Sequence, residues 1–158
     1  MDSAKAFWAD PSEENRARLP EWLNFDGVRD QYLSVPERLR DLYPPEAWHL
    51  DWERMSRPGN IEAQFQLFSD YASHVARFRE LAEYHRAQPP PCLLLWGRHD
   101  AYFDVDEIID YARALDRLEM HVCDAGHLLL ETHAPECAAA MRAFIADVTT
   151  ERAASSTA

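Results

Sequence analysis

The stretch PPPCLLLWGRHDAYF, residues 89–103, decides the fold of this chain. Its three prolines end any preceding helix, because proline lacks the backbone N–H that a helix needs. The run from Cys92 to Trp96 that follows is apolar at every position, a pattern typical of a strand buried on both faces. Such strands belong to parallel sheets covered by helices, and this one leads into a polar turn that contains Asp100.

Helix and strand patterns alternate downstream of this run. Residues 106–115 predict an amphipathic helix, residues 119–123 a second short strand and residues 135–148 an Ala-rich helix. The order strand, helix, strand, helix predicts an α/β fold with two parallel strands and covering helices. The small, polar segment 151–158 is expected to be a flexible tail.

The part of the chain before the prolines has a different character. Residues 20–60 mix prolines with scattered aromatic residues, which predicts short helices joined by turns. Over residues 60–86 apolar side chains keep helical spacing, so we predict one long helix with Asn60 as its N-cap. The sequence therefore predicts a helical lid (cap) segment over 1–88 and a core part over 89–150. Aromatic residues of the lid segment are expected mainly in a core, with a substrate pocket as the alternative: Trp22, Tyr32, Tyr43, Trp48 and Trp52.

Charge and hydropathy exclude several classes of partner. The chain has 16 Lys and Arg residues against 28 Asp and Glu residues, a formal charge of -12, which repels phosphate backbones and anionic lipid headgroups. We therefore expect no nucleic-acid partner and no membrane association. No apolar run approaches the ~18 residues of a membrane span, and residues 1–10 contain no apolar signal segment, so a cytoplasmic protein is expected. The three cysteines, Cys92, Cys123 and Cys137, are expected to be reduced and packed as small hydrophobic residues.

Ionisable residues follow both predicted strands. Asp100 comes just after the first strand, and His127, in the segment DAGH (124–127), comes just after the second. Because the carboxyl ends of parallel strands meet at one edge of a sheet, we expect these two side chains to form a hydrogen-bonded pair. Such a pair is the acid and base part of a nucleophile, histidine and acid triad. The alternatives are that Asp100 only caps a turn and that His127 is a structural histidine.

The other histidines near this edge are interpreted as structural. His133 is expected at a helix start as a surface or packing residue, and His99 is expected to point away from Asp100. His121, His127 and His133 recur every six residues, a spacing that fits neither one helix face nor the closely spaced ligand pairs of zinc sites. We therefore expect no metal and no cofactor.

The segments PPCLLLWGRHDAYF (90–103) and VCDAGHLLLETHAPECAAAMRAFI (122–145) resemble the α/β-hydrolase family, in particular its lidded branch of epoxide hydrolase-like and haloalkane dehalogenase-like enzymes. In that family the last two core strands end in W-G-x-x-D and in a G-H turn. The resemblance implies that Asp100 is the triad acid and His127 the triad base. It also implies that the substrate is a small molecule with an ester, epoxide or haloalkyl group, and that residues 22–86 are the lid.

The family's nucleophile elbow, G-x-S-x-G or its Asp version, is absent. The four glycines, Gly27, Gly59, Gly97 and Gly126, are never four residues apart. We therefore expect this chain to be the C-terminal part of an α/β-hydrolase fold, inactive alone and able to act on a small-molecule substrate when completed by an N-terminal half. The resemblance leaves open whether the nucleophile is Ser or Asp. The alternative function is a non-catalytic hydrolase remnant that acts as an interaction module.

One edge of the predicted strand over residues 92–96 is expected to be unpaired. In the family a neighbouring strand would lie beside residues 92–96, and this chain contains no candidate for it. Because a free edge of an apolar strand pairs readily with another strand, we expect possible self-association through residues 92–96.

Overall fold

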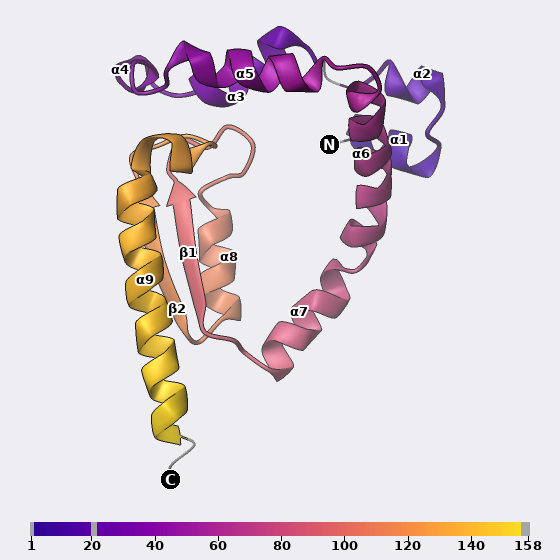
Figure 1. Ribbon diagram of the computed structural model, residues 1–158. Helices are drawn as coiled ribbons and strands as arrows, with labels where there is room; N and C mark the ends of the chain where they lie inside the picture. Colours follow the sequence, from indigo (N-terminus) through magenta and orange to yellow (C-terminus); the bar gives the residue numbers. More distant parts are fainter. Residues whose placement is uncertain (1, 20–21, 156–158) are drawn as a thin grey trace. The chain divides into compact units, whose positions relative to one another are not determined.

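The computed structural model describes residues 2–19 and 22–155 (Figure 1). Within them, the elements are α1 (Asp2–Ala9), α2 (Glu13–Arg16), α3 (Phe25–Leu33), α4 (Glu37–Arg40), α5 (Pro45–Met55), α6 (Asn60–Ala76), α7 (Phe78–Ala87), β1 (Cys92–Gly97), α8 (Glu107–Ala114), β2 (Leu118–Cys123) and α9 (Leu129–Ser155). Helices and a parallel strand pair in one chain are compatible with the predicted α/β class. No helix among these residues is both long and apolar enough to cross a membrane.

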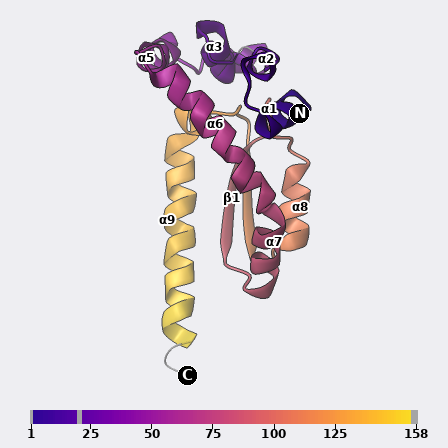
Figure 2. The same cartoon turned by 90° about the vertical axis from the view of Figure 1, so that its right-hand side faces the viewer.

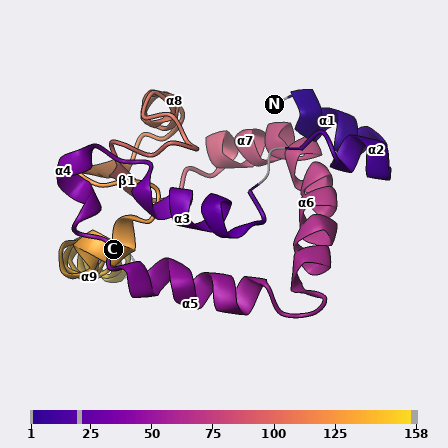
Figure 3. The same cartoon turned by 90° about the horizontal axis from the view of Figure 1, so that it is seen from above.

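Strands β1 and β2 form the parallel pair that the sequence predicts. Cys92 lies opposite Leu118, and Gly97 lies opposite Cys123, so the two strands are in register from end to end. Because parallel neighbours need a crossover, the chain between them contains α8. In Figures 1, 2 and 3 the strands lie between α8 and α9. The predictions of both strands and of α8 are confirmed, with ends that differ by at most one residue. The prediction that residues 92–96 are buried on both faces is wrong, because all five side chains are half-buried in the described chain.

The core beside the strands is small. Ala125, Leu129 and Cys137 are buried together, and Leu95 of β1 packs against them. All three cysteines carry free thiols, as predicted, and burial raises the pKa of Cys92 and of Cys123. These cysteines therefore pack as small apolar side chains.

Helix α9 is longer than the sequence predicts. The expected helix covered residues 135–148, whereas α9 runs from Leu129 to Ser155 with a kink at His133 (φ -126°, ψ 26°). Pro135 explains the kink, since its ring removes a helical hydrogen bond and crowds the preceding turn. The prediction of a flexible tail over 151–158 also differs from the structure, because residues 151–155 continue α9 through the helix-favouring Ala153 and Ala154. The last part of that prediction, residues 156–158, lies outside the described residues.

The predicted single helix over residues 60–86 is wrong. The structure has two helices, α6 and α7, separated at Arg77 (φ -94°, ψ 0°), whose N–H bonds to the carbonyl of His74. The prediction of Asn60 as N-cap is also wrong, because the cap is Gly59, with φ +86°. Only glycine adopts this left-handed conformation without strain, and the Asn60 amide instead donates to the carbonyl of Arg54 at 2.7 Å.

The chain divides into two compact units. One contains Met1–Asp30 and Pro45–Glu83, and the other contains Gln31–Pro44 and Tyr84–Ala158. Residues 31–44 therefore belong with the strands, although the sequence places them in the lid segment. The predicted division into 1–88 and 89–150 remains a prediction.

Aromatic residues hold the first unit together. The Trp8 indole N–H donates to the carbonyl of Phe68 at 2.8 Å, and the Phe7 ring stacks on Phe68 at 6.0 Å, so α1 packs along α6 (Figure 3).

Of the aromatic residues that were expected mainly in a core, Tyr32, Tyr43 and Trp48 are buried, whereas Trp22 and Trp52 are half-buried.

Candidate functional site

Hydrogen bonds between the strands continue past their ends and hold two loops together. The Arg98 N–H donates to the carbonyl of Cys123 at 3.0 Å, and the His99 N–H donates to the carbonyl of Ala125 at 3.0 Å. The loop after β1 and the loop after β2 therefore leave the sheet side by side. This arrangement brings Asp100 and His127 to one edge.

Asp100 and His127 form the hydrogen-bonded pair that the sequence predicts. The Nδ1 atom of His127 lies 3.0 Å from Oδ2 and 3.2 Å from Oδ1 of Asp100. Only 10% of the Asp100 side chain and 27% of the His127 side chain are exposed. The predicted proximity is confirmed, and a catalytic role of the two residues remains a prediction.

The backbone fixes the Asp100 carboxylate independently of His127. Its Oδ1 atom accepts hydrogen bonds from the N–H groups of Tyr102 at 2.8 Å and Phe103 at 3.0 Å, and the Asp100 N–H donates to the carbonyl of Gly97 at 3.0 Å. An ionised carboxylate only accepts hydrogen bonds, so Nδ1 of His127 is the donor and carries the proton. The lone pair of Nε2 is then available as a base, which is the histidine geometry of acid–base catalysis.

Two aromatic side chains lie against the imidazole, and the sequence reasoning missed both. The His127 ring lies 4.8 Å from the Tyr102 ring and 5.6 Å from the Phe103 ring, with the Phe103 plane inclined by 28°. Both aromatic residues are exposed. The only signal in the sequence was their place two and three residues after Asp100.

The three other histidines after β1 have separate partners. The His99 Nε2 atom lies 2.9 Å from Asp124 Oδ1, so His99 engages Asp124 and not Asp100, as predicted. His121 pairs with Glu119 at 2.6 Å, and Nδ1 of His133 lies 2.8 Å from the hydroxyl of Thr132. In the described part of the chain, no three His, Cys, Asp or Glu side chains gather as a metal site.

Asp124 is the most strongly paired carboxylate at this edge. Both of its oxygens face the guanidinium of Arg38, with Nη2 to Oδ1 at 2.8 Å, and Arg98 Nε lies 3.3 Å from Oδ1. The hydrogen bond from Arg38, followed by the one from His99, holds the pKa of Asp124 well below its usual range. Nothing in the sequence pattern connected Arg38 with Asp124, because 86 residues separate them.

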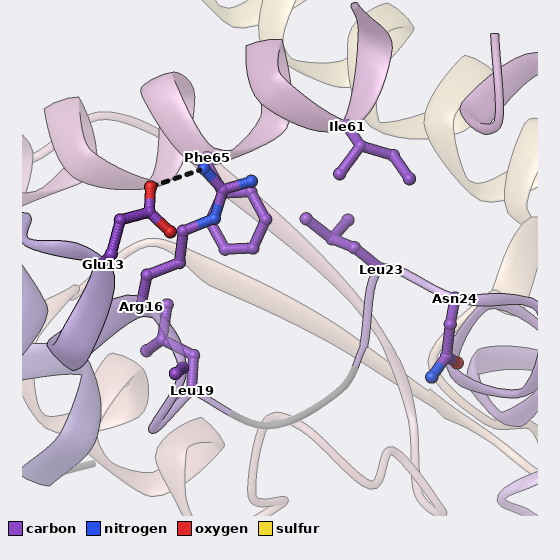
Figure 4. Close-up of a pocket in the computed structure, with 8 residues that line it drawn as sticks. Glu13, Arg16, Leu19, Leu23, Asn24, Ile61 and Phe65 are labelled. Atoms are coloured by element: carbon purple, nitrogen blue, oxygen red, sulfur yellow. Dashed lines mark ion pairs between the residues drawn. The ribbon is translucent and has the colours of Figure 1, made fainter. Parts of the chain in front are cut away.

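A cavity of about 530 Å³ is lined by residues of the first unit (Figure 4). The Arg16 guanidinium lies 3.7 Å from the centre of the Phe65 ring at this cavity. It also pairs with Glu62 at 2.8 Å and lies 3.7 Å from Glu13, so carboxylates already neutralise its charge. None of the predicted site residues lines this cavity.

Comparison with known proteins gives one clear similarity. The chain is 33% identical over 89 residues to a protein of Saccharomyces cerevisiae named an uncharacterized hydrolase. The match covers 56% of this chain and 31% of the yeast protein, so the chain matches about a third of the length of that relative. No protein-family model matches the chain, and no solved structure matches it.

Proposed function

We propose that this chain supplies the acid and base of a hydrolase of the lidded α/β-hydrolase branch, with a small-molecule ester, epoxide or haloalkyl substrate. The observation that carries the proposal is the Asp100–His127 hydrogen bond at the carboxyl ends of two parallel strands. The similarity to the yeast hydrolase supports the same reaction class. Asp100 is the acid that holds the imidazole, and His127 is the base.

The chemistry assigned to His127 takes one of two forms. With a serine nucleophile, Nε2 accepts the hydroxyl proton while the serine oxygen bonds to the substrate carbonyl carbon, and the imidazolium returns that proton to the leaving group. With an aspartate nucleophile, the carboxylate displaces the halide or opens the epoxide, and Nε2 then accepts a proton from the water that cleaves the resulting ester. In both forms Asp100 stabilises the imidazolium. The nucleophile would come from a segment outside these 158 residues, because the chain contains no elbow motif.

The test compares two forms of the protein. The first is the 158-residue chain alone, and the second is this chain joined to a preceding or separately encoded segment that contains G-x-S-x-G or G-x-D-x-G. Both are assayed on activated esters, epoxides and haloalkanes, as wild type, His127→Ala and the control His133→Gln. We expect no turnover from the chain alone, because loss of a triad nucleophile costs on the order of 10⁶ in kcat. We expect turnover from the completed form that His127→Ala abolishes and His133→Gln leaves unchanged.

Two outcomes would contradict the proposal. Turnover by the completed form that survives His127→Ala would remove the base role. Turnover by the highly purified chain alone that His127→Ala abolishes would require a nucleophile within the 158 residues or from a second copy.

The alternative is a non-catalytic interaction module, which exposed apolar side chains of α5 and α6 favour. Leu50, Leu67 and Tyr71 are all exposed, and such groups support contacts with a protein partner. The absence of an elbow-bearing segment in the DNA upstream of Met1 would favour this alternative, and its presence would favour the enzyme.

A further inference from the structure

The segment Ser34–Tyr43, here called the strap, contacts the loop that carries His127. It contains α4 and belongs to the same compact unit as the two strands. Val35, Leu39 and Tyr43 of the strap are buried. The strap lies about 80 residues before the loop Asp124–His127 in the sequence, and the two are in contact in the structure. Three separate contacts join the strap to this loop.

The first contact is ionic. The two terminal nitrogens of Arg38 face the two carboxylate oxygens of Asp124, an arrangement that fixes direction as well as distance. The Oδ1 atom of the same carboxylate also lies 2.9 Å from Nε2 of His99, the residue before Asp100. Asp124 therefore links the strap to both loops that carry the proposed acid and base.

The second contact is a hydrogen bond next to the proposed base. The N–H of Gly126 donates to the hydroxyl oxygen of Tyr43 at 3.2 Å, in a buried setting. A buried N–H that loses its acceptor is destabilised, because water does not replace the bond. The Tyr43 hydroxyl thus holds the Ala125–Gly126 peptide group, one residue before His127.

The third contact is steric. A methyl group on Gly126 would lie 2.4 Å from Cγ1 of Val35. The strap and the loop backbone therefore touch with no room for a side chain between them.

We propose that Arg38 and Tyr43 are positioning residues that hold the His127 imidazole against Asp100. This inference rests on the proposed function, because it assigns a purpose to a fixed imidazole. Asp100 is fixed by its own backbone contacts with Tyr102 and Phe103. The position of His127 depends in addition on its loop, and the strap contacts this loop at Asp124 and Gly126. Loss of a strap contact therefore loosens the Asp100–His127 bond while the strand pair stays intact.

The experiment uses NMR on the full chain. The first variant, Tyr43→Phe, removes the hydroxyl that accepts the Gly126 N–H and keeps the aromatic ring. The second, Arg38→Lys, keeps the positive charge but has one nitrogen in place of the two that face the Asp124 carboxylate. Their controls are Tyr84→Phe, which removes an exposed hydroxyl, and Arg40→Lys, an exposed arginine of the same helix α4. The readouts are amide exchange at Gly126, amide exchange in β1 and β2, and the low-field Nδ1–H proton resonance of His127.

We expect Tyr43→Phe to speed exchange of the Gly126 amide by about tenfold, the size of change that follows from loss of one buried hydrogen bond. We expect the His127 Nδ1–H resonance to broaden or disappear in Tyr43→Phe and to weaken in Arg38→Lys. Protection of the strand amides and both control variants should match the wild type.

Two results would overturn the proposal. One is unchanged Gly126 exchange and an unchanged Nδ1–H resonance in Tyr43→Phe and Arg38→Lys. The other is a uniform rise in exchange over β1, β2 and the loop, which would make the strap a general stabiliser and not a positioning element. These readouts need no turnover. Failure of the completed form in the hydrolase assay would therefore refute the proposed function, while the local effect in the NMR experiment would still support the positioning role of the strap. Hydrolysis that depends on His127, together with unchanged Gly126 exchange and an unchanged Nδ1–H resonance in the variants, would refute only the positioning role of the strap.

Discussion

A methyl group added to Gly97 would lie 2.2 Å from the carbonyl oxygen of Gly126. Gly97 is the last residue of β1, and Gly126 directly precedes His127. The carbonyl oxygen of Ala125 would lie 2.7 Å from the same methyl group. All these neighbouring atoms belong to the backbone, so they cannot rotate away, and the close approach of the two loops requires glycine at position 97.

Replacement of Gly97 by Ala should therefore force the two loops apart. We expect Gly97→Ala to lower the free energy of unfolding by about 1–3 kcal/mol, the usual cost of overpacking. The His127 ring resonances should shift as well, because the displaced peptide groups adjoin it. Urea unfolding and NMR spectra check both effects, and a variant with wild-type stability and spectra would contradict the close approach.

Replacement of Asp100 by Asn should move the proton of His127. The Asn side-chain carbonyl can accept the N–H groups of Tyr102 and Phe103, which turns its NH₂ group toward Nδ1 of His127. Nδ1 then becomes the acceptor and the proton moves to Nε2. Ring ¹⁵N shifts report this tautomer, and in the completed hydrolase kcat should fall by about 10⁴, as in serine proteases with the same replacement. An Asn variant that keeps its proton on Nδ1 would contradict the assigned geometry.

Truncation of Leu129 should remove a large part of the small core beside the strands. Leu129 is 7% exposed, whereas its neighbour Leu130 is 62% exposed. We expect Leu129→Ala to cost about 2–5 kcal/mol in unfolding free energy. The matched control Leu130→Ala should change the unfolding free energy by less than about 0.5 kcal/mol. Equal effects of the two substitutions would show that α9 does not pack through Leu129.

The strong pairing of Asp124 predicts a dependence of stability on pH. Its pKa is lowered in the folded chain, first by the Arg38 hydrogen bond and then by His99, so the ionised form favours folding. This contribution is fully present above the unfolded pKa of about 4 and is lost as pH falls through the lower folded value.

The stability difference between wild type and Asp124→Asn should therefore be constant from neutral pH to about pH 5 and should shrink below about pH 4. Asp124 is 41% exposed, so added salt should reduce the difference. Urea unfolding over this pH range, at low and high salt, measures it. A difference that grows as pH falls would have the wrong sign for this pairing.

The second edge of β1 should promote association of the chain. In the part of the chain that the structure describes, the sheet has two strands, so β1 pairs only with β2. An unpaired edge of an apolar strand is a template for another strand. We expect sedimentation to show concentration-dependent association at micromolar concentrations, with β1 amides more protected as concentration rises. A monodisperse monomer with strongly protected amides over Cys92–Gly97 would rule this out.

The sequence by itself determined the elements around the candidate site. The apolar run before Gly97 predicted a strand, which the structure contains, although residues 92–96 are half-buried and not fully buried as predicted. The DAGH turn and Asp100 were assigned to one sheet edge from the direction of parallel strands alone. The place of the strand and of the sheet edge was predicted correctly because both depend on local pattern and on the geometry that every parallel pair shares.

Only the tertiary structure decided what surrounds His127. Arg38 contacts Asp124 and Tyr43 contacts Gly126 at sequence separations of 86 and 83 residues. The periodicity of apolar residues in a sequence does not predict contacts between such distant positions. The break at Arg77 was equally hidden, since helical spacing of apolar residues persists through it. The sequence predicts which residues prefer to be buried, and packing between distant segments determines which of these residues contact each other.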